Sequence, residues 1–323
     1  MPKSQPALAP MLVLTDEQVQ NLLPLTPLID AIAHAFCHEY SSYQAPVRSR
    51  FEEGNRVILV MPCQADGAIG VKTILLAQTA GRGAGTYSSS YTFHSLDGEV
   101  TAFFEANIMT ELRTAATSAV ATRALAPESV HTLGIFGTGS IAKAHVAALL
   151  AARAFARVLV CGSTPEKSRE FAQRMQQRHG IPVAAVDSET CVAESSVICT
   201  CTTSPKPLFP GGWIRPGTHI NAVGAFTPQN RELDSEAIAR SRVVVDTFGG
   251  ALAEAGDLLK PIAEGRITRE HIVADLHGAL RDPAAVRRNP SEITVFKSVG
   301  CALEDMVAAR VLLRRALPSW NVG

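Results

Sequence analysis

The chain has 323 residues, of which 46% are hydrophobic and 19% charged, and its 30 basic side chains are balanced by 30 acidic ones. This composition is typical of a globular protein with a large core and excludes a disordered chain, and the zero net charge argues against nucleic acid or an anionic membrane as partner. No apolar run is long enough to cross a bilayer, and residues 1–10 lack the order of a signal peptide. We therefore expect a cytoplasmic protein that acts on small molecules.

The first part of the sequence predicts two helices followed by an antiparallel sheet. Thr15 or Asp16 caps one helix, and apolar residues at helical spacing predict a second over residues 25–40. A long helix rich in alanine, threonine and leucine closes the region and ends at Pro127. The strands, separated by glycine-bearing turns, are expected at 56–61, 68–76, 87–95 and 99–105, and the long helix at 108–126.

From residue 131 the sequence alternates between short apolar strands and helices. Strands that are apolar on both faces and alternate with helices are typical of a parallel sheet covered on both sides. We therefore expect a doubly wound α/β domain after a boundary near residue 126. Its strands are predicted at 132–136, 157–161, 183–186, 196–202, 219–223 and 242–246, and its first helices at 141–153 and 165–179.

A glycine motif follows the first of these strands and opens the next helix. Gly137 allows a tight turn, Gly139 lets the backbone approach a pyrophosphate, and Ala142 lets helix and strand pack closely. The free N–H groups at the helix start favour an anion there. The pattern predicts a Rossmann dinucleotide site, with NAD(H) or NADP(H) bound at Gly137, Thr138, Gly139, Ser140 and Ile141.

The end of the second strand of this domain bears on the choice of nucleotide. An acidic residue there would bind the ribose 2′-hydroxyl of NAD(H), but Cys161 is followed by Gly162 and then by hydroxyl side chains. We therefore expect NADP(H) to be preferred over NAD(H), with the 2′-phosphate received by Ser163, Thr164 and Lys167.

Four ordered motifs, at 111–118, 223–234, 253–258 and 293–305, resemble the ornithine cyclodeaminase/mu-crystallin family. The resemblance extends from about residue 11 to 316. It implies a substrate-binding and dimerisation domain over 1–126, completed by 306–323, and a Rossmann NAD(P)-binding domain over 127–305. It also implies a homodimer. Known members differ in the reaction they catalyse, so the resemblance indicates the cofactor better than the substrate.

The resemblance also implies which residues contact the substrate. Arg113 matches an arginine that clamps the substrate α-carboxylate, and a guanidinium fork suits a carboxylate well. Lys72 matches an active-site lysine that binds the carboxylate or donates a proton, although an edge-strand lysine has the same appearance in sequence. Arg48 aligns with a second carboxylate-binding arginine, with Arg50 as a competitor. Thr86 matches a threonine near the substrate.

The sequence departs from the cyclodeaminases after its fifth Rossmann strand. Those enzymes carry an aspartate two residues after a glycine, where it handles the substrate's side-chain amine. Here Gly224 is followed by Ala225 and Phe226, and Phe226 accepts no proton, so it is expected to line an apolar substrate site or to pack in the core. Asp234 is interpreted as a helix cap. Further cofactor contacts are expected at the ends of the later strands, at Thr202, Thr203, Ser204, Val223 and Ser298.

These features favour an NAD(P)H-dependent oxidoreductase acting on the C–N bond of a small α-imino or α-amino acid, such as a reductase of the cyclic ketimine Δ1-pyrroline-2-carboxylate. The alternatives are an ornithine cyclodeaminase and a mu-crystallin-like protein that binds NADPH without turnover. The expected partners are imino, amino or keto acids. No metal is expected: Cys199 and Cys201 are interpreted as residues on one strand face, and His34 and His38 as partly exposed helix residues.

Overall fold

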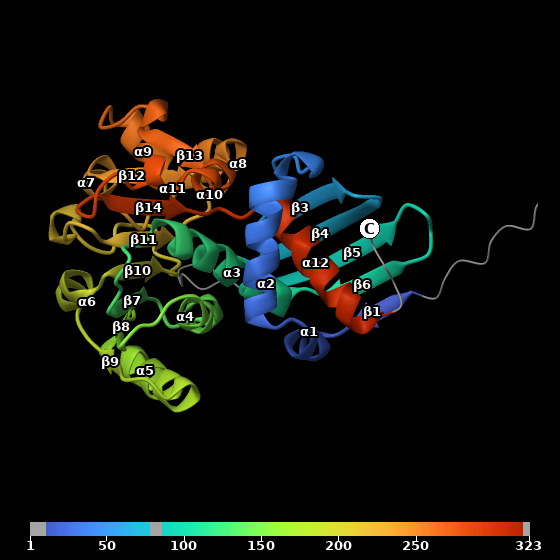
Figure 1. Ribbon diagram of the computed structural model, residues 1–323, viewed down its shortest axis with the longest axis horizontal. Helices are drawn as coiled ribbons and strands as arrows, with labels where there is room; N and C mark the ends of the chain where they lie inside the picture. Colours follow the sequence, from blue (N-terminus) through green and yellow to red (C-terminus); the bar gives the residue numbers. More distant parts are fainter. Residues whose placement is uncertain (1–10, 78–85, 319–323) are drawn as a thin grey trace, which may run out of the picture. The chain divides into compact units, whose positions relative to one another are not determined.

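The computed structural model describes residues 11–77 and 86–318, which belong to two compact units (Figure 1). The first unit is formed by Met1–Pro24, Ser41–Thr110 and Cys301–Gly323, and the second by Leu25–Tyr40 and Glu111–Gly300. This division differs from a boundary at residue 126, because 25–40 and 111–126 group with the second unit. The helix at 25–34 packs on the helix of the glycine motif, and Thr122 accepts a hydrogen bond from Asn221 of the parallel sheet.

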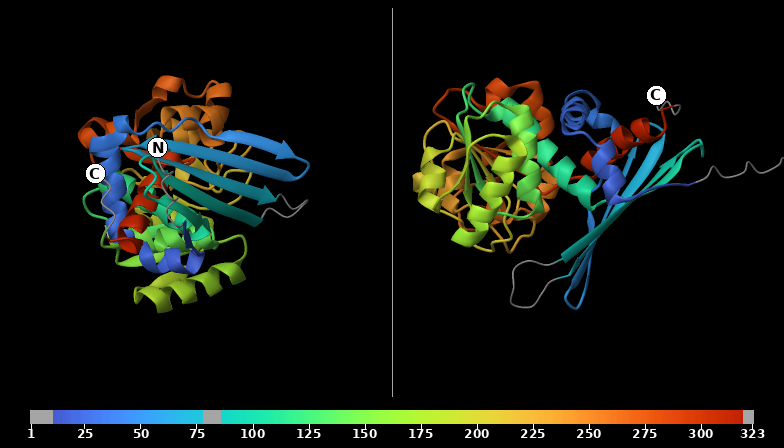
Figure 2. Two further views of the ribbon diagram at one scale, coloured as in Figure 1. Left: turned by 90° about the vertical axis from the view of Figure 1, so that its right-hand side faces the viewer. Right: turned by 90° about the horizontal axis from the view of Figure 1, so that it is seen from below.

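The first unit is built on a sheet with the strand order β1-β6-β5-β4-β3-β2, and Figure 2 shows these strands side by side. Strands β2 to β6 pair antiparallel, as expected, whereas β1 adds in parallel to β6. Strands β1 and β2 were not predicted from the sequence. The strands are β1 Leu12–Leu14, β2 Ser49–Glu53, β3 Arg56–Ala65, β4 Ala68–Ala77, β5 Thr86–Ser95 and β6 Thr101–Glu105.

One face of this sheet forms the core of the first unit. Buried and exposed residues alternate along β3 and β4, as the two-residue period of a strand requires. The C-terminal helix α12 (Ala302–Ala316) packs on β3 and β4 and buries most of its residues. Helix α1 (Asp16–Leu22) lies against α12. Its cap is Thr15, one of the two residues expected there, and Thr15 forms a capping box with Gln18.

The opposite face of the same sheet carries exposed apolar side chains. They come from strands across the sheet and lie at the alternating positions that face away from α12. An apolar sheet face of this kind is typical of a surface that meets a partner. The exposed residues are Val13, Phe51, Ile58, Ile69 and Leu75.

The second unit is a sheet of eight parallel strands with helices on both sides (Figure 1). Its order is β13-β12-β14-β11-β10-β7-β8-β9, which confirms the expected doubly wound Rossmann fold. The strands are β7 Thr132–Phe136, β8 Arg157–Cys161, β9 Val183–Ala185, β10 Val197–Thr200, β11 His219–Ala222, β12 Ser241–Val245, β13 Ile272–Asp275 and β14 Ile293–Lys297. Strands β13 and β14 were not predicted.

The helices of the second unit include several short ones that were not predicted from the sequence, although the start of one of them, at Asp234, was expected. Helix α3 (Asn107–Leu125) begins in the first unit and continues into the second, and the expected helix over 25–40 ends as a π-helical turn at Ala35–Glu39. The others are α2 Leu25–His34, α4 Ser140–Ala152, α5 Pro165–His179, α6 Ser188–Glu194, α7 Ser235–Ala239, α8 Phe248–Glu254, α9 Gly256–Ala263, α10 Leu276–Arg281 and α11 Pro283–Val286. Over the described parts of the chain, no helix has the length and apolarity that a membrane span needs.

Candidate functional site

The glycine turn between β7 and α4 has the geometry of a dinucleotide site. Gly137 has φ +113°, and a Cβ there would lie 2.6 Å from the carbonyl oxygen of Cys201, so only glycine fits. Gly139 is exposed and has open space where a Cβ would stand. Helix α4 begins at Gly139 without a side-chain cap, which leaves its first N–H groups available to a pyrophosphate. These residues therefore fit a bound dinucleotide.

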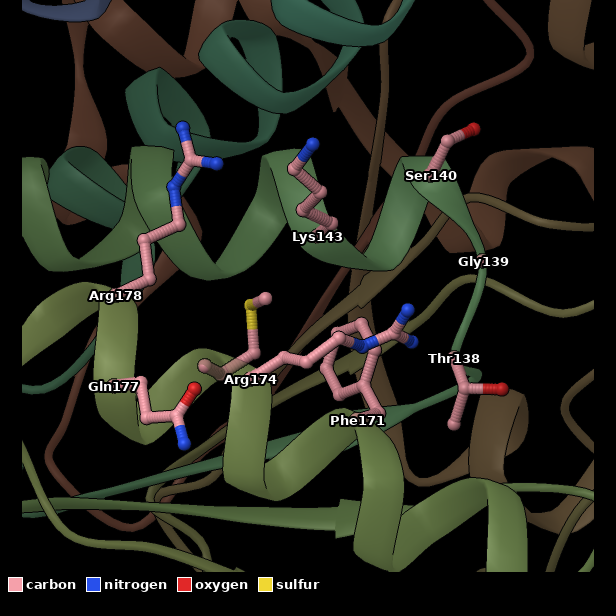
Figure 3. Close-up of a pocket in the computed structure, with 9 residues that line it drawn as sticks. Thr138, Gly139, Ser140, Lys143, Phe171, Arg174, Gln177 and Arg178 are labelled. Carbon is pink, nitrogen blue, oxygen red and sulfur yellow. The ribbon is translucent and has the colours of Figure 1, made fainter.

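A cavity of about 510 Å³ opens beside this turn (Figure 3). Thr138, Gly139, Ser140 and Lys143 line it from the glycine turn and α4, and Arg174 and Arg178 line it from α5. The two arginines lie in the middle and last turns of α5, away from its N-terminus. They therefore give the cavity positive charge.

The loop after β8 contains the three residues expected to receive a 2′-phosphate. Ser163, Thr164 and Lys167 are all exposed. The Thr164 hydroxyl caps α5 by accepting the backbone N–H of Lys167. The nearest acid, Glu166, is also exposed and pairs with Arg169. The loop thus presents hydroxyl groups and one ammonium but no carboxylate at the strand end.

Glu232, which was not among the residues selected from the sequence, joins the loops after β10 and β11. Its buried carboxylate accepts hydrogen bonds from the Thr200 hydroxyl, from the backbone and hydroxyl of Thr202, and from the backbone of Gly224, each at 2.7 Å. Burial and the nearby charge of Asp257 raise the pKa of this carboxyl above its ordinary value. The carboxylate therefore fixes the positions of Thr202 and Val223–Gly224, where cofactor contacts were expected.

A buried ion pair between Lys297 and Asp257 also holds the loop after β11. Lys297, the last residue of β14, lies 2.8 Å from Asp257, and both side chains are fully buried. Lys297 also donates to the carbonyl of Ala225, and Asp257 accepts the backbone N–H groups of Glu232 and Leu233. The loop after β11 is thus held by charged groups from three separate segments of the chain.

Arg113 is buried in α3, and its guanidinium lies against Gly300. A Cβ at Gly300 would be 2.7 Å from Nη1, and the residue has φ +84°, so the position requires glycine. Asp246 fixes this turn by accepting bonds from the Ser298 hydroxyl and from the backbone of Val299 and Gly300. The structure thus brings Arg113 and Ser298 to one turn at the end of β14.

The remaining candidates of the second unit lie in the loops after β10 and β11. Thr203 is exposed, and Ser204 is half-buried and donates to the carbonyl of Lys206. Phe226 is half-buried and packs against the core beneath the sheet. Asp234 caps α7, as predicted.

Lys72 occupies the core face of β4 in the first unit. Strand β4 pairs with β3 and β5, so the interpretation of Lys72 as an edge-strand residue is wrong. Its ammonium lies 2.6 Å from the carboxylate of Asp305 on α12, and both side chains are fully buried. Gly70, on the same face, leaves room for Tyr91, whose hydroxyl would otherwise collide with a Cβ.

The other candidates of the first unit are Arg48, with Arg50 as its competitor, and Thr86. Arg48 is half-buried in the segment before β2, whereas Arg50 lies in β2 and pairs with Glu52 at 2.6 Å. Thr86 begins β5, but its side chain lies outside the described part of the chain. In the second unit, His34 and His38 are exposed, and His34 lies 3.1 Å from Glu39.

Four buried acids and one buried lysine were not identified from the sequence, because their role depends on partners far away in the chain. Glu232, Asp246, Asp257, Lys297 and Asp305 are all fully buried. The available signal was a charged residue within an apolar run, since a buried charge needs a partner. The sequence alone did not identify those partners.

Comparison with known proteins places this geometry in a family. The family model described as "Ornithine cyclodeaminase/mu-crystallin family" matches residues 10–319. A Δ1-pyrroline-2-carboxylate reductase of Bacillus cereus is 37% identical over 317 residues, covering 95% of this chain and 97% of the relative.

Two solved structures share the whole architecture. The Δ1-pyrroline-2-carboxylate reductase of Thermococcus litoralis, in complex with NADH and L-proline, has a TM-score of 0.90 and 33% identity, covering 96% of this chain and 98% of the other. An archaeal alanine dehydrogenase dimer with bound NAD has a TM-score of 0.89 and 26% identity, covering 97% and 98%. The chain belongs to the ornithine cyclodeaminase/mu-crystallin family.

Proposed function

We propose that this protein is an NAD(P)H-dependent reductase of a small cyclic imino acid, with Δ1-pyrroline-2-carboxylate as the preferred substrate. The observation that carries the proposal is the segment Val223–Thr227 after β11, which contains Phe226 and no acidic residue. A substrate with a free side-chain amine would meet no carboxylate from this segment. The similarity to reductases of Δ1-pyrroline-2-carboxylate supports the same choice over an ornithine cyclodeaminase.

The proposed roles follow the chemistry of each side chain. Arg113, buried and held against Gly300, would bind the substrate carboxylate with its guanidinium fork. Arg48 would provide a second carboxylate contact, and Thr86 and Phe226 would contact the rest of the substrate. Lys72 would bind the carboxylate or supply the proton to the imine nitrogen.

The dinucleotide would bind at the glycine turn, where the uncapped start of α4 fits a pyrophosphate. When bound, the reduced nicotinamide supplies the hydride for the C=N carbon. The further contacts proposed for the cofactor are Gly137, Thr138, Gly139, Ser140, Ile141, Thr202, Thr203, Ser204, Val223 and Ser298.

The test is a panel of cyclic imines, keto acids with amines, and ornithine, assayed for nicotinamide absorbance and for ammonia. Imine-dependent oxidation of the cofactor is expected. Ammonia release from ornithine without net absorbance change would overturn the proposal in favour of a cyclodeaminase. Binding of NADPH with no turnover on any substrate would favour a mu-crystallin-like binding protein.

Arg113→Lys should raise KM for the imino acid, because an ammonium cannot form the bidentate contact. Arg123→Lys, on the same helix and paired with Asp30, is the matched control.

NADP(H) is the proposed preference between the two nucleotides, because the loop after β8 carries Ser163, Thr164 and Lys167 but no acid at the strand end. Fluorescence titration should give a lower Kd for NADPH than for NADH. Ser163→Asp should weaken NADPH binding more than NADH binding, since a carboxylate repels the 2′-phosphate. Tighter binding of NADH by the unmodified protein would contradict the preference.

The protein is also proposed to form a homodimer through the exposed apolar face of the six-stranded sheet. Phe51 is 58% exposed and Leu75 40%, although both are large apolar side chains. Light scattering is expected to give the mass of a dimer, and Phe51→Glu with Leu75→Glu is expected to give a folded monomer. A monomeric unmodified protein would refute this interface.

A further inference from the structure

A cluster of two thiols and one imidazole lies in the second unit, at the end of β10 and beside α4. Cys199 lies in β10, and Cys201 follows that strand directly, so both side chains point to the same side. Their sulfur atoms are 3.5 Å apart. His145, in α4, is fully buried, and one donor atom from each of the three residues lies within 4.8 Å of the others. The described residues thus bring together an S₂N donor set.

The hydrogen bonds of His145 fix which ring nitrogen carries the proton and which has the lone pair that a cation needs. Its Nδ1 lies 2.7 Å from the backbone carbonyl of Ile141, and a carbonyl only accepts, so Nδ1 carries the proton. Nε2 is therefore the acceptor nitrogen and receives the Ser118 hydroxyl at 3.0 Å, a hydrogen bond that a cation on Nε2 would replace. An imidazole that donates one N–H to a backbone carbonyl and offers its other nitrogen is the usual arrangement of a metal-binding histidine.

We propose that Cys199, Cys201 and His145 form a binding site for a thiophilic d¹⁰ cation of the Zn²⁺ and Cd²⁺ type. Soft sulfur ligands with imidazole select such ions. The Ser118 hydroxyl or a water molecule would complete a four-coordinate shell.

The charge balance of binding is favourable in a buried site. Cysteine binds such a cation as the thiolate, so each thiol gives up its proton on binding. Binding exchanges two protons for one divalent ion: two S–H bonds break, two metal–sulfur bonds form, and two protons leave to solvent. The loaded site carries no net charge, which avoids the large cost of an uncompensated buried charge. Cys201 is half-buried, so the cluster is not sealed on every side.

The site would lie directly behind the glycine turn. The backbone N–H of Cys201 donates to the carbonyl of Phe136 at 2.8 Å, and the Cys201 carbonyl fills the space beside Gly137. A cation held by Cys201 would therefore contact the strand end that supports this turn.

The test is titration of the reduced, metal-stripped full chain with Cd²⁺, followed by the ultraviolet thiolate-to-cadmium charge-transfer band. The expected result is one Cd²⁺ and two released protons per chain. The band should be lost in Cys199→Ser/Cys201→Ser, and His145→Gln should bind Cd²⁺ about tenfold or more weakly. Cys37→Ala removes a half-buried thiol elsewhere in the same unit and should leave binding unchanged.

Far-ultraviolet circular dichroism checks that each variant is folded. If the double variant fails to fold, the cadmium NMR chemical shift of the unmodified protein reads the donor set directly, and a shift typical of two sulfurs and one nitrogen is required. Absence of the band in the unmodified protein would overturn the proposal. A band of equal strength in the folded double variant would also overturn it. The same holds if the unmodified protein takes up no Cd²⁺ and mild oxidant instead joins Cys199 and Cys201 in a disulfide.

Discussion

The Lys72 ammonium lies 2.6 Å from the Asp305 carboxylate, although the two residues are 233 positions apart and both side chains are fully buried. The pair connects the middle of β4 to the first turn of α12 within the first unit. Removing either charge would leave the other buried with its strongest partner gone, which typically costs about 3 to 5 kcal/mol. Lys72 is therefore tied to a stabilising contact as well as being the proposed substrate lysine.

Single substitution of this pair should lower both stability and turnover. Lys72→Met and Asp305→Leu are each expected to reduce the free energy of unfolding by about 3 kcal/mol or more. Chemical denaturation followed by circular dichroism measures the loss, and the imine reductase assay measures turnover.

The double variant Lys72→Met/Asp305→Leu separates the two roles, because replacing both charges with apolar groups removes the unpaired charge. It should be more stable than either single variant and should still lack normal activity. A double variant with full activity would contradict the role proposed for Lys72. Additive stability losses would contradict the coupling of the pair.

Gly300→Ala should impair substrate binding as well as stability. The new methyl group would meet the Arg113 guanidinium at 2.7 Å and push it out of place. The change should raise KM for the imino acid about tenfold, which corresponds to about 1.4 kcal/mol of lost binding.

Gly265→Ala is the matched control for Gly300→Ala. Gly265 also has positive φ, at +69°, but no other atom lies within 4 Å of the place that its new methyl group would occupy. Both variants should lose about 1 to 2 kcal/mol of stability from the left-handed backbone. Only Gly300→Ala should change KM, and an equal KM for the two variants would rule out the steric effect on Arg113.

Local patterns in the sequence were sufficient to predict the Rossmann unit. The run from β7 through the glycine turn into α4 combines a buried apolar strand, two glycines and a helical period, and all of these act over a few residues. Strand β2 (Ser49–Glu53) was missed because all its side chains are exposed and polar residues dominate it. Strand β13 was missed because its residues are only partly buried at the edge of the sheet.

Pairings between distant segments could not be predicted from such local patterns. Nothing near Asp305 or Glu232 in the sequence identifies Lys72 or Gly224 as partner. The expectation for Cys199 and Cys201 had the same limit. Their common strand face was predicted, whereas His145 reaches them only through the packing of α4 on the sheet.

Glu232→Gln should weaken dinucleotide binding by loosening the loops after β10 and β11. A carboxylate accepts all four hydrogen bonds from these loops, whereas the amide NH₂ of glutamine cannot accept. The expected cost is about 2 kcal/mol of stability and a higher Kd for NADPH, measured by denaturation and by fluorescence titration. Glu236→Gln, four residues along, makes the same change at an exposed carboxylate that lies 4.0 Å from Arg240, and it should change neither quantity. If the two variants behave alike, Glu232 does not position these loops.

His219 should make the stability of the protein fall at mildly acidic pH. Its ring is buried between Thr294, 2.8 Å from Nδ1, and Asn221, 3.3 Å from Nε2. Burial, with a smaller contribution from the charge of Arg287, lowers its pKa from 6.5 to about 3. Below pH 6.5 the imidazole is therefore protonated in the unfolded chain but stays neutral in the folded protein. The free energy of unfolding falls as the pH is lowered from 6.5 to about 3.

The expected loss from this single group is about 2 kcal/mol between pH 7 and pH 5. Denaturant unfolding at the two pH values should show that loss in the unmodified protein. His219→Gln, which does not titrate, should show a smaller dependence by about the same amount, whatever its stability at pH 7. His131→Gln is the control, because His131 is exposed, and it should retain the full pH dependence. Equal pH dependence in the unmodified protein and in His219→Gln would mean that His219 is protonated in the folded state as readily as in the unfolded one.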